Sequence, residues 1–313
     1  MPIRQKSKPA IDAGSRGFSG CSVGYGKGYF KGGRGRTYLC GGGWGGGAIP
    51  SPVFVFHFSF FTSMRYFLWL SYLGTAYCGW QRQPNGMSVQ QCVEEALATI
   101  LRRPIPLTAA GRTDAGVHAR QMATHFDTDT PLPDPPSLVG RLNGLLPPSI
   151  AALRIHAVRP DAHARFSATA RTYIYAVTDV KDPFMPGGVH RMSLRGVDFE
   201  AMNRAAAVLP EYADFTSFSK LHTDVKTNIC RITRADWRRE GACWIFTITA
   251  DRFLRNMVRA IVGTLLEVGR GRRSVDDFRR VIEACDRCRA GDSAAADGLT
   301  LLHVAYPPEI HLD

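Results

Sequence analysis

From Met64 onward, short apolar strand patterns alternate with amphipathic helix patterns, and this alternation limits the class of fold. The first strand pattern, residues 65–72, is rich in aromatic side chains. Ser88 and Gln91 then form a capping-box sequence, and the apolar residues that follow at 3.6-residue spacing predict a helix. Further strands are predicted over 122–128, 153–158, 172–177 and 299–305, with a short helix over 137–145.

The second half of this region repeats the alternation. Two strand patterns, 230–237 and 243–250, predict a hairpin with a turn at Glu240-Gly241. Helices are predicted over 199–209, over 253–268 and from Ser274. Strands mixed with helices and hairpins predict an α+β fold with antiparallel sheets, in an N-terminal domain over 64–170 and a C-terminal domain over 171–313.

Residues 1–63 have a different texture. The first 50 residues hold 15 of the 31 glycines, too little apolar surface to offset the entropy of ordering, so they are predicted to be disordered. The apolar run 53–61 is too short to span a bilayer, and no membrane association is expected. A transit peptide is an alternative that the glycine blocks fit poorly. We favour a third interpretation, in which Met64 is the working start.

The charge balance and the cysteines point to a broad class. The formal net charge is +12, of which residues 1–63 carry +7 and the remainder +5. A mildly basic body suits a nucleic-acid partner, and a solvated basic surface without a partner is the alternative. Eight scattered cysteines without a clear secretory signal indicate reduced thiols and a cytoplasmic protein.

The stretch from Ala110 to Ala119 gathers the groups that could do chemistry. Its Asp114-Ala115-Gly116 sequence predicts a tight turn, in which glycine takes a positive φ. The stretch also holds Arg112 and His118, and we interpret His118 as a group that supports the turn. Local composition alone leaves open whether Asp114 is reactive or only a turn residue.

Other candidates lie further along the chain. Arg252, Arg255 and Arg259 fall on one side of the predicted helix over 253–268, which favours a solvated basic face. The alternative is that one arginine holds a carboxylate ionised or that several reach phosphates. Tyr173 and Tyr175 share a strand face, where tyrosines usually pack but can also stack on an extruded base.

The sequence lacks the motifs of several functional classes. The histidines show no metal-ligand spacing, and the motifs of nucleotide-cofactor enzymes and serine hydrolases are missing. The only CxxC sequence, Cys285 to Cys288, has no second pair at zinc-ribbon spacing, so we interpret it as two cysteines at a helix end. We therefore expect neither a metal nor a small-molecule cofactor.

The sequence Gly-Arg-Thr-Asp-Ala-Gly-Val-His-Ala at 111–119 resembles the active-site motif of the tRNA pseudouridine synthase A family. The opening motif of that family resembles residues 77–83 with 88–90, and its middle motif resembles residues 163–173. Its late motifs resemble residues 214–218 and 253–263. These segments follow the family's order and spacing from Met64 to about Pro307.

The resemblance implies a fold, a reaction and a set of roles. The fold would be the pseudouridine synthase fold, two ferredoxin-like halves joined around a central cleft. The reaction would convert uridine to pseudouridine at positions 38 to 40 of the tRNA anticodon stem-loop, in a homodimer without cofactor. Asp114 would be the catalytic aspartate, acting at C1′ or as a base at C2′ of the ribose. Arg259 would pair with it, Tyr173 would stack on the base, and Arg112 would fill the gap left by the flipped nucleotide.

Two other functions remain as alternatives. A non-catalytic RNA-binding module on the same fold would keep the basic cleft and the aromatic faces. An aspartate-based glycoside hydrolase would need a second carboxylate at a suitable distance, and the sequence nominates none.

Overall fold

The computed structural model describes residues 63–185, 187–220 and 227–312, so the predictions for the first 62 residues lie outside the described part. The described residues all belong to one compact unit, Phe58–Asp313. They form the strands β1 (Met64–Tyr72), β2 (Thr108–Ala109), β3 (His118–Thr128), β4 (Ile150–Val158), β5 (Ala170–Thr178), β6 (Val189–Arg191), β7 (Ile232–Glu240), β8 (Cys243–Ala250) and β9 (Leu299–Ala305). The helices are α1 (Val89–Leu101), α2 (Pro135–Leu145), α3 (Phe199–Ala206), α4 (Met257–Gly269) and α5 (Val275–Glu283).

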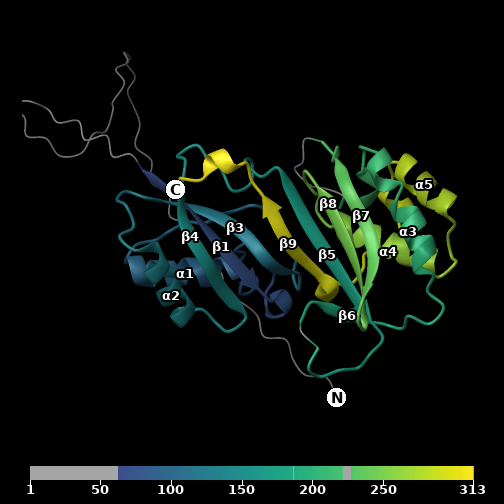
Figure 1. The fold of residues 1–313 in the computed structure, drawn as a ribbon, viewed down its shortest axis with the longest axis horizontal. Helices are drawn as coiled ribbons and strands as arrows, with labels where there is room; N and C mark the ends of the chain where they lie inside the picture. Colours follow the sequence, from purple (N-terminus) through teal and green to yellow (C-terminus); the bar gives the residue numbers. More distant parts are fainter. Residues whose placement is uncertain (1–62, 186, 221–226, 313) are drawn as a thin grey trace, which may run out of the picture. The chain divides into compact units, whose positions relative to one another are not determined.

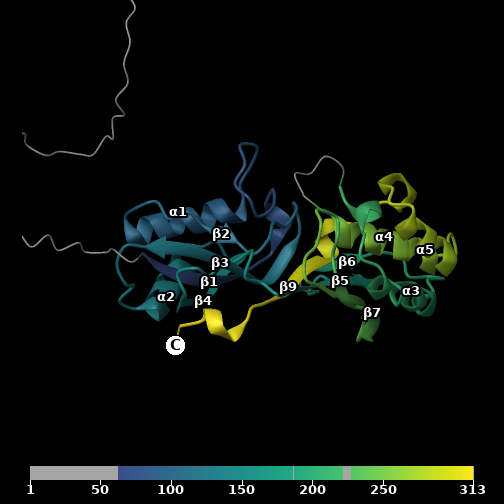
Figure 2. The ribbon, with the colours of Figure 1, turned by 90° about the horizontal axis from the view of Figure 1, so that it is seen from above.

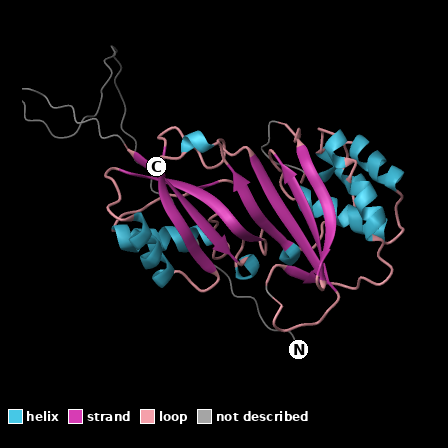
Figure 3. Cartoon of the chain, in the orientation of Figure 1, coloured by secondary structure: helices cyan, strands magenta, loops and turns pink. Residues whose placement is uncertain are grey.

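These strands make one sheet with the order β4-β1-β3-β9-β5-β8-β7, and the α+β prediction is confirmed (Figures 1 and 3). Neighbours pair antiparallel, as predicted, except at two places. β6 runs parallel to β5, and β9 runs parallel to β3 through His118 opposite Thr300 and Ala119 opposite Leu301. Parallel neighbours need a long connection, and β9 meets this condition because it enters from the far end of the chain. The parallel β3–β9 pair is thus the seam of the sheet.

Two hydrophobic clusters lie on either side of this seam. The first packs α1 and α2 on β1, β3 and β4, and it includes the fully buried Leu68 of β1 and Leu97 of α1. The second packs α3, α4 and α5 on β5, β7 and β8. Figure 2 shows the two groups of helices beside their own strands. Tyr173 packs against both clusters, so its strand β5 lies where the cores meet. The domain boundary at residue 170 stays a prediction.

The predicted helix starts are partly confirmed. Ser88 caps α1 by accepting a hydrogen bond from the Gln91 backbone at 3.2 Å, but the Gln91 side chain bonds Glu95, so only half of the predicted box forms. Asp198 caps α3 as predicted, although α3 ends three residues earlier than predicted. Ser274 begins α5 with a complete capping box.

The helix predicted over 253–268 begins only at Met257. Asn256 has φ +65°, a left-handed conformation that asparagine tolerates better than most residues and that interrupts an α-helix. Arg252 and Arg255 therefore precede α4, and the predicted arrangement of three arginines along one helix face is wrong. The residues before α4 form a loop that carries its side chains independently of the helix.

Two further observations concern the described part of the chain. β3 begins at His118, four residues earlier than predicted, so the end of the 110–119 stretch is itself part of the sheet. Among the described residues, no helix is both long enough and apolar enough to cross a bilayer.

Candidate functional site

Asp114 lies in the tight turn that the sequence predicts. The amide of Val117 donates to the carbonyl oxygen of Asp114 at 3.1 Å, and Gly116 takes φ +81°. Positive φ at this position of a turn favours glycine. Because backbone groups close the turn, the carboxylate of Asp114 is available to other partners.

Residues of the segment 72–80 contact Thr113, the residue before Asp114, and support this turn. Gly79 has φ +108°, and a Cβ at this position would lie 2.7 Å from the carbonyl oxygen of Thr113. The amide of the next residue, Trp80, donates to the same oxygen at 3.1 Å. Tyr72 bonds the hydroxyl of Thr113 at 2.9 Å. The residue before Asp114 is thus held on both its main chain and its side chain.

His118 supports the other side of the turn. Its Nδ1 accepts a hydrogen bond from the amide of Gly74 at 2.9 Å, so Nε2 must carry the ring proton and donate to the carbonyl of Asp297 at 3.0 Å. Burial lowers the pKa of His118, which keeps this neutral tautomer. The ring links the start of β3 to the segment before β9, in line with the supporting role that we predict.

Two arginines face the carboxylate of Asp114. Nη1 of Arg259 lies 3.7 Å from Oδ2, and Nε of Arg255 lies 3.9 Å from Oδ1. Arg259 is the more buried, with 22% of its side chain exposed against 58% for Arg255, and its Nε donates to the carbonyl of Ala294 at 2.7 Å. Arg259 is therefore fixed by the fold, whereas Arg255 extends from the loop before α4.

The sequence leaves Arg255 as one of three arginines that either form a solvated face or reach an anion, and the resemblance names only Arg259 as the partner of Asp114. The signal that could have found it is its place in the 253–263 motif, immediately before Asn256, whose conformation ends the loop.

The four residues named by the resemblance line one pocket. Asp114, Arg259, Tyr173 and Arg112 surround a volume of about 40 Å³, together with Phe253 and other residues of the loop before α4. The rings of Tyr173 and Phe253 meet edge to face, with centroids 5.2 Å apart. Burial raises the pKa of Tyr173 to about 12, so its phenol is neutral at physiological pH. The pocket combines a carboxylate, cations and an aromatic ring.

A half-buried arginine to which the sequence assigns no role ties the loops of this pocket together. Arg171 donates hydrogen bonds to the carbonyl of Ala110 at 3.2 Å and to that of Asp251 at 2.7 Å. It also donates to the carbonyls of Arg165 at 2.5 Å and Ala168 at 3.1 Å. Burial lowers the pKa of Arg171. One guanidinium thus joins the chain before Asp114, the 163–169 loop and the loop that carries Arg255.

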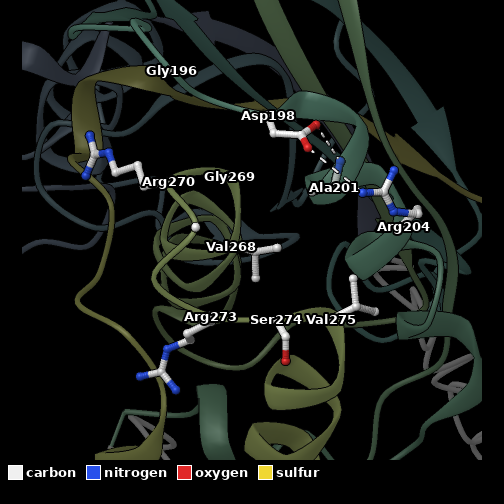
Figure 4. Close-up of a pocket in the computed structure, with 11 residues that line it drawn as sticks. Gly196, Asp198, Ala201, Arg204, Val268, Gly269, Arg270, Arg273, Ser274 and Val275 are labelled. Atoms are coloured by element: carbon white, nitrogen blue, oxygen red, sulfur yellow. Dashed lines mark hydrogen bonds and ion pairs between the residues drawn. The ribbon is translucent and has the colours of Figure 1, made fainter.

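A larger pocket, of about 400 Å³, lies at the other end of α4 (Figure 4). Arg204, Arg270 and Arg273 line it, but their guanidinium groups point away from one another. The Asp198 carboxylate in its wall caps α3 and approaches Arg204 at 3.9 Å. These charges do not converge on a common point, so size alone does not make this pocket the site.

The described residues contain no group of three or more His, Cys, Asp or Glu arranged to hold a metal ion. Cys285 and Cys288 are free thiols exposed beyond the end of α5, with Cys285 at φ +47° and Cys288 in a short 3₁₀ turn.

Comparison with known proteins gives a consistent result. A family model described as tRNA pseudouridine synthase matches residues 212–307. The tRNA pseudouridine synthase A of Parabacteroides distasonis is 60% identical over 246 residues, which cover 79% of this chain and 97% of that protein. The enzyme of the same name from Bacteroides thetaiotaomicron is 58% identical over 79% of this chain and 92% of its own length. That of Burkholderia multivorans is 43% identical over 79% and 91%.

Proposed function

The chain belongs to the tRNA pseudouridine synthase A family, and on this premise we propose that it converts uridine to pseudouridine in the anticodon stem-loop of tRNA, at positions 38 to 40. The observation that carries the proposal is the approach of Arg255 and Arg259 to the carboxylate of Asp114, in a pocket that Tyr173 also lines. A partly buried carboxylate between two cations is suited to act as an anion on the ribose of a bound nucleotide.

The reaction is an isomerisation in which atoms balance within the substrate. The bond between N1 and C1′ breaks, the uracil turns over, and a bond forms between C5 and C1′. The proton on C5 is lost and N1 gains one. Asp114 acts in the first stage, either as the nucleophile at C1′ or as the base that takes a proton from C2′. Both routes need an ionised carboxylate, and Arg259 and Arg255 place positive charge 3.7 and 3.9 Å from its two oxygens.

The other pocket residues take roles in binding. The neutral ring of Tyr173 is placed to stack on the extruded uracil, because it lines the pocket and is held in an edge-to-face contact with Phe253. Arg112 is exposed and lies two residues before Asp114, so it is placed to enter the space that the flipped nucleotide leaves. Arg259 orients Asp114 through its own bond to Ala294.

The test is release of tritium from C5 of uridine in unmodified tRNA incubated with the full chain. We expect release by the wild-type protein and none by Asp114→Asn. Asp129→Asn serves as the matched control, because Asp129 is a mostly exposed aspartate paired with Arg103 at the surface. Full release by Asp114→Asn would refute the assigned role. Tight binding of tRNA without release by the wild type would instead favour the non-catalytic RNA-binding module.

We also propose that the protein works as a homodimer in the cytoplasm, as the resemblance implies. Light scattering after size-exclusion chromatography should give twice the chain mass. A monomer with full activity would contradict the proposed assembly without affecting the proposed reaction.

A further inference from the structure

The loop 163–169, in the connection from β4 to β5, presents an exposed aromatic ring beside two groups that suit nucleic acid. Phe166 is 76% exposed. The ring of His163 lies against it with centroids 4.4 Å apart, and the guanidinium carbon of Arg165 lies 5.6 Å from its centroid. A single exposed phenylalanine is common on protein surfaces. Phe166, however, lies beside an imidazole and a guanidinium, and the three groups together offer stacking and positive charge.

The backbone of this loop is held firmly beneath the ring. Nδ1 of His163 accepts hydrogen bonds from the amides of Arg165 and Phe166, at 3.0 and 3.3 Å. Ala164 lies between His163 and Arg165. Its amide donates to Nδ1 of His125 at 3.1 Å, and its carbonyl accepts from the hydroxyl of Tyr306 at 2.5 Å. The exposure of Phe166 is therefore built into an ordered loop, and stacking on it would cost little conformational entropy.

The loop is also fixed to the candidate active site. Arg171 bonds the carbonyl of Arg165 with the same guanidinium that bonds Ala110 and Asp251. Ala110 precedes the turn of Asp114, and Asp251 is the first residue of the loop that carries Arg255. Loop 163–169 and the two loops that meet at Asp114 are consequently held in place by the same residue, Arg171.

We propose that Phe166, flanked by His163 and Arg165, is a stacking platform for an unpaired nucleobase of the substrate RNA other than the target uridine. Bases stack on aromatic side chains without sequence preference, which fits an enzyme that acts on several positions of one stem-loop. Arg165 adds a cation for the adjacent phosphate. The inference rests on the proposed function, because it takes tRNA as the ligand.

The test compares steady-state kinetics and equilibrium binding of unmodified tRNA for variants at residue 166. Base stacking contributes about 1–3 kcal/mol, so Phe166→Leu and Phe166→Ala should raise both KM and Kd by about 5- to 150-fold, with little change in kcat. Phe166→Trp should keep the wild-type values because it keeps an aromatic face. Phe184→Ala is the matched control: Phe184 is 92% exposed in the segment after β5, at the strand end opposite to loop 163–169, and its loss should leave KM unchanged.

A spectroscopic measurement separates stacking from a general loss of binding. Stem-loop RNAs that carry 2-aminopurine at single loop positions should show quenching of its fluorescence at one position with wild type and with Phe166→Trp, but not with Phe166→Leu.

Equal KM and Kd for Phe166→Leu, Phe166→Trp and wild type would overturn the platform, as would an equal effect of Phe184→Ala. A change of oligomeric state in Phe166→Ala would assign the ring to contact with a second copy and also overturn it. A wild-type protein that binds tRNA without tritium release would refute the proposed reaction, while the Kd and quenching series would still decide the platform.

Discussion

Arg259 approaches Asp114 to 3.7 Å, and the segment that leads into β9 holds the arginine in place. The Nε of Arg259 donates to the carbonyl of Ala294, and the amide of Ala294 donates back to the carbonyl of Arg259 at 2.9 Å. A Cβ at Gly263, one turn further along α4, would lie 1.7 Å from the carbonyl oxygen of Asp292. The segment before β9 therefore packs directly on α4. The segment that leads into β9 therefore also sets the position of Arg259.

The two arginines on Asp114 should differ in importance. Arg259→Lys removes the fixed fork that contacts both Asp114 and Ala294, so we expect kcat to fall at least about 100-fold, in the range seen when one preorganised electrostatic group is lost. Arg255→Lys should cost about 10-fold or less, because Arg255 is largely exposed and its charge is screened by solvent. Single-turnover tritium release with saturating enzyme measures both. A larger loss of kcat for Arg255→Lys than for Arg259→Lys would make Arg255 the more important partner of Asp114.

The close contact of Gly79 with Thr113 predicts a sensitive position away from the carboxylate itself. Gly79→Ala should reduce activity strongly, because its Cβ would collide with the main chain that carries Asp114. Gly196→Ala is the control, since Gly196 also has positive φ, at +72°, but nothing lies within 4 Å of its Cβ position. Both variants should lose roughly 1–2 kcal/mol of unfolding free energy from backbone strain. Only Gly79→Ala should also lose kcat. Equal activities would show that the contact does not position the turn.

Arg171 should matter for both stability and activity. Arg171→Lys keeps the charge but cannot reach four carbonyls with one ammonium, and each hydrogen bond that is lost costs about 0.5–1.5 kcal/mol. We expect a lower denaturation midpoint and a lower kcat with the fold retained by circular dichroism. Arg159→Lys, at an exposed pair with Asp161, should change neither. An unchanged kcat in Arg171→Lys would show that Arg171 stabilises the fold without contributing to the reaction.

The stability of the protein should decrease on acidification through His125. This residue is buried and its Nδ1 accepts from the amide of Ala164, and burial lowers its pKa to about 4. The unfolded chain takes up the proton near pH 6.5 and the folded protein only near pH 4. The free energy of unfolding is therefore level above about pH 6.5 and falls as the pH drops toward 4, by up to about 1.4 kcal/mol per pH unit for one such group.

Urea denaturation between pH 7 and pH 4.5 tests this dependence. His125→Gln cannot titrate, so its curve should fall less steeply with decreasing pH even if the variant is less stable throughout. Some slope should remain, because burial also lowers the pKa of His156 to about 4. Parallel curves for wild type and His125→Gln would contradict the contribution of His125.

Local pattern alone was enough to determine much of this protein. Alternating apolar residues predict the strands, and short-range polar signals such as those at Ser88, Asp198 and Ser274 predict the helix starts, because caps and periodicity involve neighbours in sequence. The turn at Asp114 was predicted for the same reason, since Gly116 decides it locally. The family resemblance then named the pocket residues, but it did so by motif and without geometry.

Only the tertiary structure decided what surrounds Asp114. The parallel pairing of β3 with β9 joins segments that are remote in sequence, and no local signal sets the partner of a strand. The left-handed Asn256 releases Arg255 from α4 and turns it toward the carboxylate, against the helix periodicity that the sequence suggests. The anchoring role of Arg171 depends on four carbonyls from three loops that only folding brings together. Sequence periodicity reports burial within one element, whereas the site is made of contacts between elements.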